Sequence, residues 1–321
     1  TYARLLVSDK RYTEARKEFE TLLAAQPDNG DLTMAVALLT VQAGDYDMAE
    51  NLFKRVLASS YKDPDAARLY LGQLYEERKR YDEALEAYAS VGRSEHYINA
   101  QARYAGVLAK TGKLDDARKH LRAVSVQNNQ ERVQLTEAEA QLLRDANQYQ
   151  EAYDLLGEAL TQLPNYPDLL YDHAMAAEKV QRLDVLEADL RKLIEIRPDH
   201  AHAYNALGYT LADRNERLPE ARNLIEKALN LAPEDPFIMD SMGWVLFRMG
   251  QNKEALDFLQ RAFMLRPDAE IAAHFGEVLW TDGQQEEARK VWSEGLKQNA
   301  KNELLRNTVK RYAPLILPAA R

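Results

Sequence analysis

Apolar side chains along the chain recur at positions i, i+3, i+4 and i+7, which is the spacing of one face of an α-helix. One stretch carries Tyr204, Leu207 and Leu211 at this spacing, and the next carries Ala221 and Ile225. Short breaks with glycine or polar residues separate such stretches, at Gly44-Asp45, Thr111-Gly112, Met249-Gly250 and Asp282-Gly283. The pattern predicts helices that are joined in pairs by short turns.

The helix-pair pattern repeats every 33 to 35 residues. A small residue opens most second helices, at Ala15, Ala49, Ala84, Ala117, Ala152, Ala221, Ala255 and Ala288, with Leu186 in the remaining place. Twelve or thirteen residues earlier lies a second small residue, at Ala3, Ala37, Gly72, Ala105, Ala140, Ala174, Gly208, Gly243 and Gly276. Four residues after the first set comes a bulky one, at Phe19, Phe53, Tyr88, Leu121, Leu156, Leu190, Ile225, Leu259 and Trp292.

This period has a direct physical meaning. Small residues where two helices cross let the backbones approach closely, whereas a bulky side chain there would separate them. A single pair cannot bury both of its faces, so neighbouring pairs must stack into a solenoid. A period near 34 residues therefore predicts one elongated array in place of separate domains.

The order of small, aromatic and proline positions resembles the tetratricopeptide repeat. The stretch Phe237–Asp268 matches best, through Met242-Gly243, Leu246, Ala255, Leu259, Ala262 and Pro267. The resemblance implies an all-α, right-handed superhelical solenoid of helix-turn-helix repeats. It implies an array over residues 1–302, with a partial repeat at 1–29 and about eight repeats of 33–35 residues. Glu139 and His173 replace usual apolar residues, which predicts loose packing or a polar contact there.

Composition narrows the class of protein further. Glycine and proline are scarce, at 13 and 11 of 321 residues, which disfavours disordered linkers and turn-rich β architectures. No apolar run reaches the length of a membrane-spanning helix, and no cysteine is present for a disulfide or a thiolate zinc site. The net charge of −9 disfavours binding to nucleic acid or anionic lipid. Many of the 17 tyrosines fall at recurrent repeat positions, which indicates packing and not a cofactor site.

Catalytic motifs are missing from the sequence. None of the six histidines forms a His-Glu-x-x-His zinc motif, and no serine lies in a Gly-x-Ser-x-Gly elbow. His200 and His202 could hold a metal, but polarity at a helix start explains them better. The segment Gly106–Lys113 resembles a phosphate loop, yet it has one residue too many between its glycines and Leu114 in place of Ser or Thr. We expect no enzyme, no metal and no cofactor.

The repeat register predicts a partner-binding groove on the first helices of the last four repeats. In the resembled family the first helices line the concave face. Counted in that register, the groove residues are Tyr171, Met175, Asn205, Tyr209, Asp213, Phe237, Asp240, Trp244, Phe247, Arg248 and Trp280. Aromatic anchors with polar neighbours are typical of peptide recognition. The alternative is that these rings only pack against the next repeat. The paired lysines and asparagines of a terminal-carboxylate clamp are not found.

The C-terminal segment, residues 303–321, is predicted to be a capping helix followed by a tail. Leu304, Leu305 and Val309 share one helical face, which suits a cap over the last repeat. Pro314 stops the helix and leaves the apolar segment 315–317. This segment either folds back on the solenoid or docks a partner.

Within the family, the resemblance is most specific over residues 201–292. This stretch, and residues 204–250 above all, is similar to proteobacterial outer-membrane tetratricopeptide lipoproteins that act as adaptors of a periplasmic carboxyl-terminal processing serine protease. The resemblance implies binding to that protease and to its substrates, notably peptidoglycan hydrolases. It also implies a periplasmic location and an N-terminal lipid anchor that lies before Thr1. A structural tether of an envelope or secretion complex would have the same repeat signature and stays open as an alternative.

Overall fold

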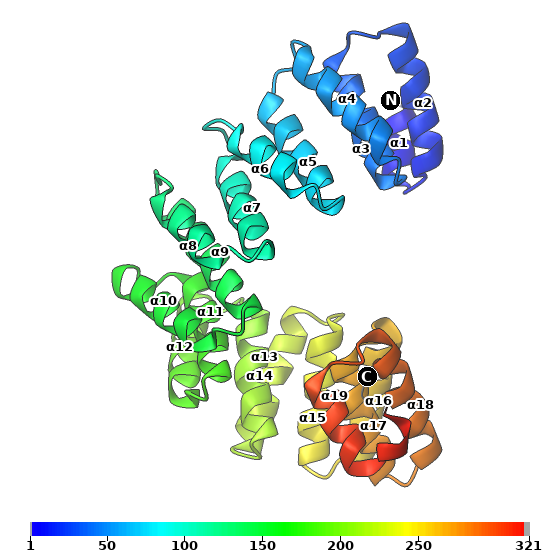
Figure 1. The fold of residues 1–321 in the computed structure, drawn as a ribbon. Coiled ribbons are helices and arrows are strands. Elements are labelled where there is room, and N and C mark those ends of the chain that lie inside the picture. The colour runs from blue at the N-terminus through cyan, green and yellow to red at the C-terminus, as the bar shows by residue number, and fades with distance from the viewer. Residues whose placement is uncertain (1, 318–321) are drawn as a thin grey trace. The chain divides into compact units, whose positions relative to one another are not determined.

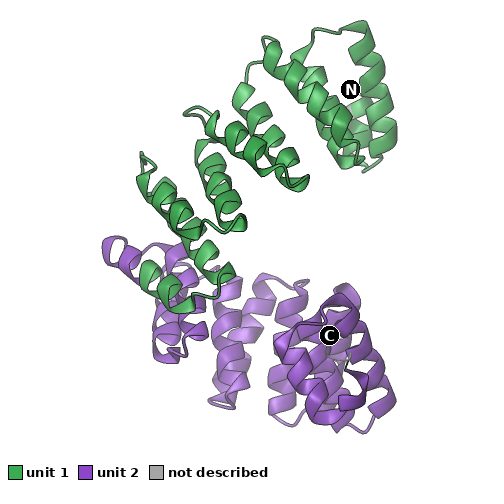
Figure 2. Cartoon of the chain, viewed as in Figure 1, with its two compact units in different colours: residues 1–156 green, residues 157–321 purple. Residues whose placement is uncertain are grey.

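The computed structural model describes residues 2–317. This part of the chain contains nineteen α-helices and one short 3₁₀ helix, joined by turns, and no β-strand (Figure 1). The chain divides into unit 1, residues 1–156, and unit 2, residues 157–321, with the boundary inside α10 (Tyr149–Gln162) (Figure 2). The other helices of unit 1 are α1 (Tyr2–Ser8), α2 (Tyr12–Ala25), α3 (Gly30–Gln42), α4 (Tyr46–Ala58), α5 (Pro64–Glu77), α6 (Tyr81–Ala89), α7 (Tyr97–Lys110), α8 (Leu114–Ala123) and α9 (Asn129–Asp145).

Unit 2 continues the same alternation of first and second helices. Its helices are α11 (Pro167–Lys179), α12 (Leu183–Ile196), α13 (Ala201–Asp213), α14 (Leu218–Leu231), α15 (Pro236–Arg248), α16 (Asn252–Leu265), α17 (Ala269–Thr281), α18 (Gln285–Gln298) and α19 (Glu303–Tyr312), followed by η1 (Pro314–Ile316). Neighbouring helices pack as pairs, for example α13 with α14 and α17 with α18. The predicted all-α array of helix-turn-helix repeats is confirmed. That residues 1–302 form one array stays a prediction.

Each turn inside a helix pair contains a residue with left-handed backbone. Glycine takes this place in four turns, at Gly44, Gly112, Gly250 and Gly283, with φ of +77° to +88°. Other residues take it in five turns, at Lys10, Lys79, Asn147, Gln181 and Asn215. The next residue donates its backbone N–H to a carbonyl five residues back, as Asp45 does to Thr40 at 3.1 Å. This is the Schellman ending of a helix, and it makes the turn as short as the sequence predicts.

The predicted rows of small and bulky residues form the core of each unit. Ala15, Ala152 and Ala288 are 0% exposed, as is Leu186 in the place of the missing alanine. A Cβ atom added at Gly276 would lie 2.1 Å from the Trp292 side chain, which is far inside van der Waals contact. The small residue therefore sets the spacing of the pair, as predicted.

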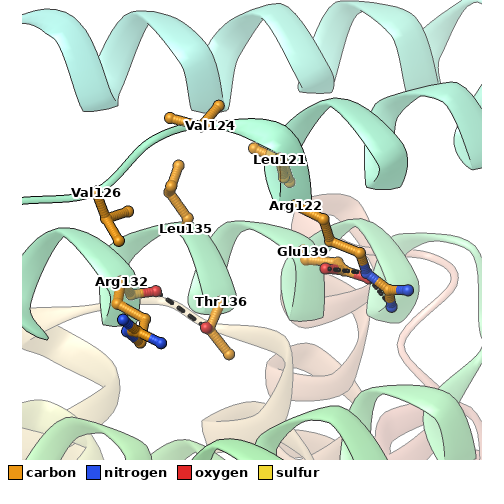
Figure 3. Close-up of a pocket in the computed structure, with 8 residues that line it drawn as sticks. All are labelled: Leu121, Arg122, Val124, Val126, Arg132, Leu135, Thr136 and Glu139. Atoms are coloured by element: carbon orange, nitrogen blue, oxygen red, sulfur yellow. Dashed lines mark hydrogen bonds and ion pairs between the residues drawn. The ribbon is translucent and has the colours of Figure 1, made fainter.

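Glu139 carries a polar contact in place of the usual apolar one. Its side chain is 4% exposed and accepts hydrogen bonds from Arg118 and Arg122. Figure 3 shows the contact with Arg122, which is 2.6 Å long. Beside this ion pair, Val124, Val126 and Leu135 help to line a pocket of about 190 Å³. A buried carboxylate is tolerated only when it is paired, and here two guanidinium groups pair it. His173 is also buried and also has a polar partner, because its Nδ1 lies 2.6 Å from Asp189 Oδ2.

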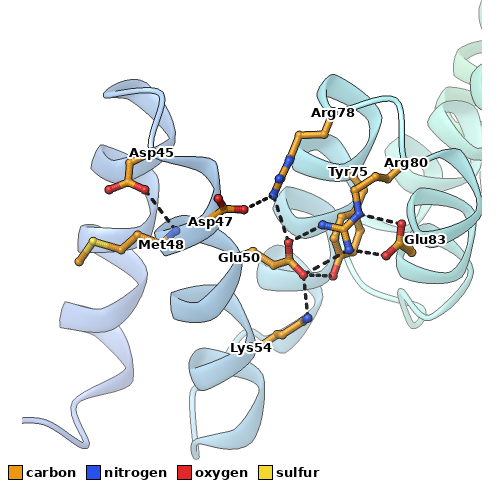
Figure 4. A network of polar contacts seen from close by, with 9 residues as sticks. All are labelled: Asp45, Asp47, Met48, Glu50, Lys54, Tyr75, Arg78, Arg80 and Glu83. Carbon is orange, nitrogen blue, oxygen red and sulfur yellow. Dashed lines mark hydrogen bonds and ion pairs between the residues drawn. The ribbon is translucent and has the colours of Figure 1, made fainter.

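Glu50 holds a second polar network in unit 1. It bonds Lys54 on its own helix and Arg78 and Arg80 from the next repeat, and the Tyr75 hydroxyl donates to it at 3.2 Å (Figure 4). Burial raises the pKa of Glu50, but hydrogen bonds from Lys54 and Arg80 outweigh burial and lower the pKa to about 2. Glu50 therefore stays ionised and joins two successive repeats.

Several tyrosines pack in the predicted way. Tyr75 and Tyr88 are 6% and 0% exposed, and the Tyr88 hydroxyl donates to Glu76 at 2.7 Å. Tyr2 and Tyr149 differ, with 58% and 36% of their surface exposed. None of the helices within residues 2–317 has the length and apolar character that crossing a membrane requires.

Helix α19 packs on α17 and α18 at the end of unit 2 (Figure 1). Leu305 and Val309 are 0% exposed, and Leu304 is half-buried. Beyond the helix, Ile316 and Leu317 pack on the core of unit 2, while Leu315 is 93% exposed. The tail thus folds back through two of its three apolar residues. Residues 318–321 of the predicted tail lie outside the described residues, as does residue 1.

Candidate functional site

Four successive first helices of unit 2 line a pocket of about 300 Å³. Tyr171 on α11, Asn205 on α13 and Asp240 on α15 hold the same repeat position, 34 or 35 residues apart, and His274 on α17 lies one residue past that position. The repeat register therefore places the first three in one row, and His274 contacts that row through Asp240. The remaining lining residues are Met175, Glu178, Lys179, Ala206, Tyr209, Thr210, Phe237, Ser241, Glu270 and Leu304.

A chain of polar contacts crosses three of these helices. His274 Nδ1 lies 2.8 Å from Asp240 Oδ2, and the Tyr209 hydroxyl lies 3.3 Å from His274 Nε2. Asp240 and His274 are 5% and 3% exposed. Since an ionised carboxylate only accepts hydrogen bonds, His274 donates from Nδ1. The contact fixes the orientation of the imidazole ring.

The charge state of His274 is set by two opposing effects. Burial lowers its pKa, but the nearby carboxylate of Asp240 outweighs burial, with smaller contributions from Asp213 and Glu277, and raises the pKa above 6.5. Burial also raises the pKa of Tyr209 far above its usual range, and the charge of Asp213 adds to this. The Tyr209 hydroxyl therefore stays protonated, and the imidazole of His274 takes up a proton readily.

Two side-chain oxygens at this pocket have no hydrogen-bond partner within the described residues. They are Oδ1 of Asp240 and Oδ1 of Asn205, and both are shielded from water. Leaving a buried acceptor unpaired costs roughly 1–3 kcal/mol. Both residues line the pocket, so a bound group that donates hydrogen bonds would recover this cost.

Trp244 does not line the pocket, but it packs against the lining residue His274. Its ring stacks on His274 with centroids 4.3 Å apart and meets Phe247 at 5.4 Å. The Arg248 guanidinium lies 5.6 Å from the Trp244 ring centroid. Trp244 is only 4% exposed. These three predicted groove residues pack together, and Trp244 holds His274 in place.

The predicted groove residues thus separate into three sets. Tyr171, Met175, Asn205, Tyr209, Phe237 and Asp240 line the pocket. Trp244, Phe247 and Arg248 form the cluster behind it. Asp213 is exposed at the last residue of α13, and Trp280 packs away from the pocket between Trp292 and Tyr312, at centroid distances of 5.6 Å and 6.0 Å.

The sequence-based prediction missed His274, Glu178 and Glu270 as pocket residues. His274 carries no register signal, because it lies one residue past the repeat position of Asp240 and is equivalent to Ser241, 33 residues earlier. Glu270 and Glu178 did carry a register signal, because they hold the repeat positions of the predicted groove residues Phe237 and Phe247. They reach the pocket from opposite ends of their helices, the end of α11 and the start of α17.

The other polar candidates have structural explanations. His200 Nδ1 accepts a hydrogen bond of 3.1 Å from the Ala203 backbone, so it caps α13 as the sequence predicts. The phosphate-loop-like segment Gly106–Lys113 lies on α7 and its turn, with no strand before it among the described residues. In unit 1, Asp63, Glu95 and His96 gather within metal-binding reach. Asp63 already caps α5, and the side chain of Glu95 is 86% exposed.

Comparison with known families agrees with the geometry. One tetratricopeptide-repeat profile matches residues 6–74, 40–96 and 75–142, and a second matches residues 171–236. The chain belongs to the tetratricopeptide-repeat proteins. It is a protein-interaction scaffold, and repeats of this family are typically not catalytic.

Individual relatives extend the comparison. The chain is 44% identical over 213 residues to the TPR repeat-containing protein PA4667 of Pseudomonas aeruginosa, covering 66% of this chain and 36% of the relative. It is 25% identical over 330 residues to cellulose synthase operon protein C of Pseudomonas fluorescens, covering 82% and 25%. The chain thus spans about a third or less of these relatives. A tetratricopeptide repeat protein from Parabacteroides merdae shares the fold, with a TM-score of 0.53, 16% identity and coverage of 88% and 97%.

Proposed function

We propose that the chain is a non-enzymatic adaptor that binds a periplasmic carboxyl-terminal processing serine protease and presents protein substrates to it. The substrates in this proposal are peptidoglycan hydrolases. The adaptor works in the periplasm and is held at the outer membrane by an N-terminal lipid outside these 321 residues. It requires no metal, cofactor or nucleic acid.

The observation that carries the proposal is the pocket on α11, α13, α15 and α17. Its aromatic side chains come from Tyr171, Tyr209 and Phe237, and its polar positions include the unpaired oxygen of Asp240. Aromatic anchors beside a few directed polar groups suit an extended protein segment. A substrate segment bound there would leave the outer faces of the repeats available to a protease.

The choice of protease adaptor rests on the sequence resemblance of residues 204–250. This stretch contains most of α13 and all of α14 and α15, and so it contributes Asn205, Tyr209 and Asp240 to the pocket. The resemblance and the pocket therefore fall on the same part of the chain, which favours a role for the pocket in substrate delivery.

The test is purification of the full-length protein from envelope extract, followed by a reconstituted cleavage assay. We expect a carboxyl-terminal processing protease and at least one peptidoglycan hydrolase to copurify. Adding the chain to these purified partners should raise the hydrolase cleavage rate at least about tenfold, because tethering raises the effective substrate concentration. An unchanged cleavage rate, or the absence of a protease from the purified complex, would contradict the proposal.

A second candidate is a structural assembly or tethering factor of an envelope or secretion complex. The observation that favours it is the alignment with cellulose synthase operon protein C over 82% of the chain. Such a factor would bind structural subunits without delivering substrates. Recovery of structural subunits alone in the same purification would support it over the protease adaptor.

A further inference from the structure

We propose that the unit 2 pocket recognises a lysine or arginine side chain on an extended segment of a partner protein. This inference rests on the proposed function in one respect, since it takes the ligand to be a protein segment, and it names the chemistry of that segment. Three features of the pocket point to a cation: its charges, its aromatic rings and its unpaired acceptor.

Negative charge predominates at the pocket. Glu178, Asp240 and Glu270 contribute carboxylates to the lining, and Lys179 contributes an ammonium group at the exposed end of α11. Asp240 is the buried member of the three, at 5% exposed. A cleft lined mostly by one sign of charge draws a group of the opposite sign. His274 also lines the pocket and adds a positive charge when it is protonated. The three carboxylates still outnumber these two cations, so the net charge is negative and favours a basic ligand over an acidic one.

Aromatic rings give the pocket a second preference for cations. Tyr171, Tyr209 and Phe237 line it, and the face of an aromatic ring attracts ammonium and guanidinium groups. Phe237 already shows this behaviour, because the guanidinium of Arg266 lies 5.0 Å from its ring centroid. The apolar stem of a lysine or arginine would pack along Met175 and these rings while its charged end reaches the carboxylates.

The unpaired Oδ1 of Asp240 supplies the third feature. Its sister oxygen accepts from His274, so the carboxylate is fixed in orientation and has one acceptor left over among the described residues. Arginine and lysine carry several N–H donors and no acceptor, so they match a site whose unpaired atoms are oxygens. Asn205 Oδ1 is the other unpaired acceptor of the same row.

The test compares short acetylated and amidated peptides that differ only in a central arginine, lysine, norleucine or glutamate. Each is titrated into the whole chain, and binding is followed by the NMR signals of the Trp244 indole and the Asn205 amide. The key variant is Glu178→Gln with Glu270→Gln. These carboxylates are not fully buried, so their change leaves the packing intact. Glu226→Gln is the matched control, because Glu226 is an exposed glutamate of α14 away from the pocket.

We expect the arginine and lysine peptides to bind about tenfold more tightly than the norleucine peptide and the glutamate peptide to bind most weakly. The double variant should raise Kd for the arginine peptide about fivefold or more, and the control should leave it unchanged. The inference would be overturned if the norleucine and arginine peptides bound with equal Kd. It would also be overturned if the double variant left the Kd of the arginine peptide unchanged.

The outcomes separate this inference from the proposed function. If the protease copurifies and cleavage is stimulated while basic peptides show no preference, only the recognition of a cation is wrong. If basic peptides bind as expected while no protease is recovered, the pocket chemistry holds and the adaptor role is wrong.

Discussion

Asp240 and His274 lie 34 residues apart on the first helices of successive repeats, and a 2.8 Å hydrogen bond joins their side chains. A repeat protein places the first helices of successive repeats side by side, so two residues far apart in sequence become neighbours. Here the neighbours are a carboxylate and an imidazole, and Tyr209 from the preceding repeat contacts the same ring. A polar contact thus couples α13, α15 and α17 inside the pocket.

The first prediction concerns pH. The pKa of His274 is raised above its unfolded value of 6.5, so protonation of His274 stabilises the folded state. This contribution is fully present below pH 6.5 and is lost as the pH rises through the folded-state pKa. Urea unfolding over a pH series should therefore show a loss of stability above pH 6.5 that is absent in His274→Gln. A His274 NMR titration midpoint below 6.5 would contradict this.

Glu50 should make unit 1 sensitive to acid. Its pKa is lowered from 4.5 to about 2, so its contribution is present above pH 4.5 and is lost as the pH falls toward 2. A shift of this size corresponds to roughly 3 kcal/mol of stability at neutral pH. Glu50→Gln should lower the free energy of unfolding by about that amount at pH 7 and by much less at pH 2. Glu226→Gln, an exposed change, serves as the control.

Because α17 and α18 approach closely at Gly276, we expect a methyl group added there to lower stability strongly. Gly276→Ala would place a Cβ 2.1 Å from Trp292, and this ring cannot move freely because it is fully buried. We expect a loss of about 2–3 kcal/mol, measured by chemical unfolding, because overpacking forces side chains and backbone to shift. Gly106→Ala is the matched control, since its Cβ would meet nothing within 4 Å. A neutral Gly276→Ala would show that the helices can separate at little cost.

The tail should stabilise unit 2. Deletion of residues 313–321 removes Ala313, which is 3% exposed, together with the partly buried Ile316 and Leu317. We expect a lower melting temperature and unchanged partner binding, because burial of apolar surface is what these residues contribute. Weaker partner binding at unchanged stability would instead favour a docking role for Leu315, which is 93% exposed.

The sequence predicted the fold well because each repeat must place small residues where its two helices contact each other. The small residues at Ala15, Ala152 and Gly276 had to lie where helices cross, and they do. Glu139 could be recognised as an anomaly, but its partners Arg118 and Arg122 could not, because surface arginines are common and only the folded chain selects two of them.

The candidate site was predicted less completely, because register gives the helix face but not the direction of each side chain. Trp244 and Asp240 are four residues apart on one face, yet the carboxylate lines the pocket while the indole is covered by His274 and Phe247. Trp280 was expected in the same strip, but its ring packs against Tyr312 of the capping helix α19. Whether an aromatic side chain lines the pocket or packs against other rings depends on which neighbours the folded chain places beside it.

The left-handed turns make the repeats unequal in their tendency to open. Five of the nine turns place Lys10, Lys79, Asn147, Gln181 or Asn215 where glycine would be free of strain. A left-handed backbone costs a non-glycine residue about 1 kcal/mol or more, less for asparagine. Replacing Lys79 or Gln181 with glycine should therefore slow amide exchange in its helix pair. Helix pairs with a glycine turn should therefore open less readily than those without one, and single glycine substitutions would reduce this difference.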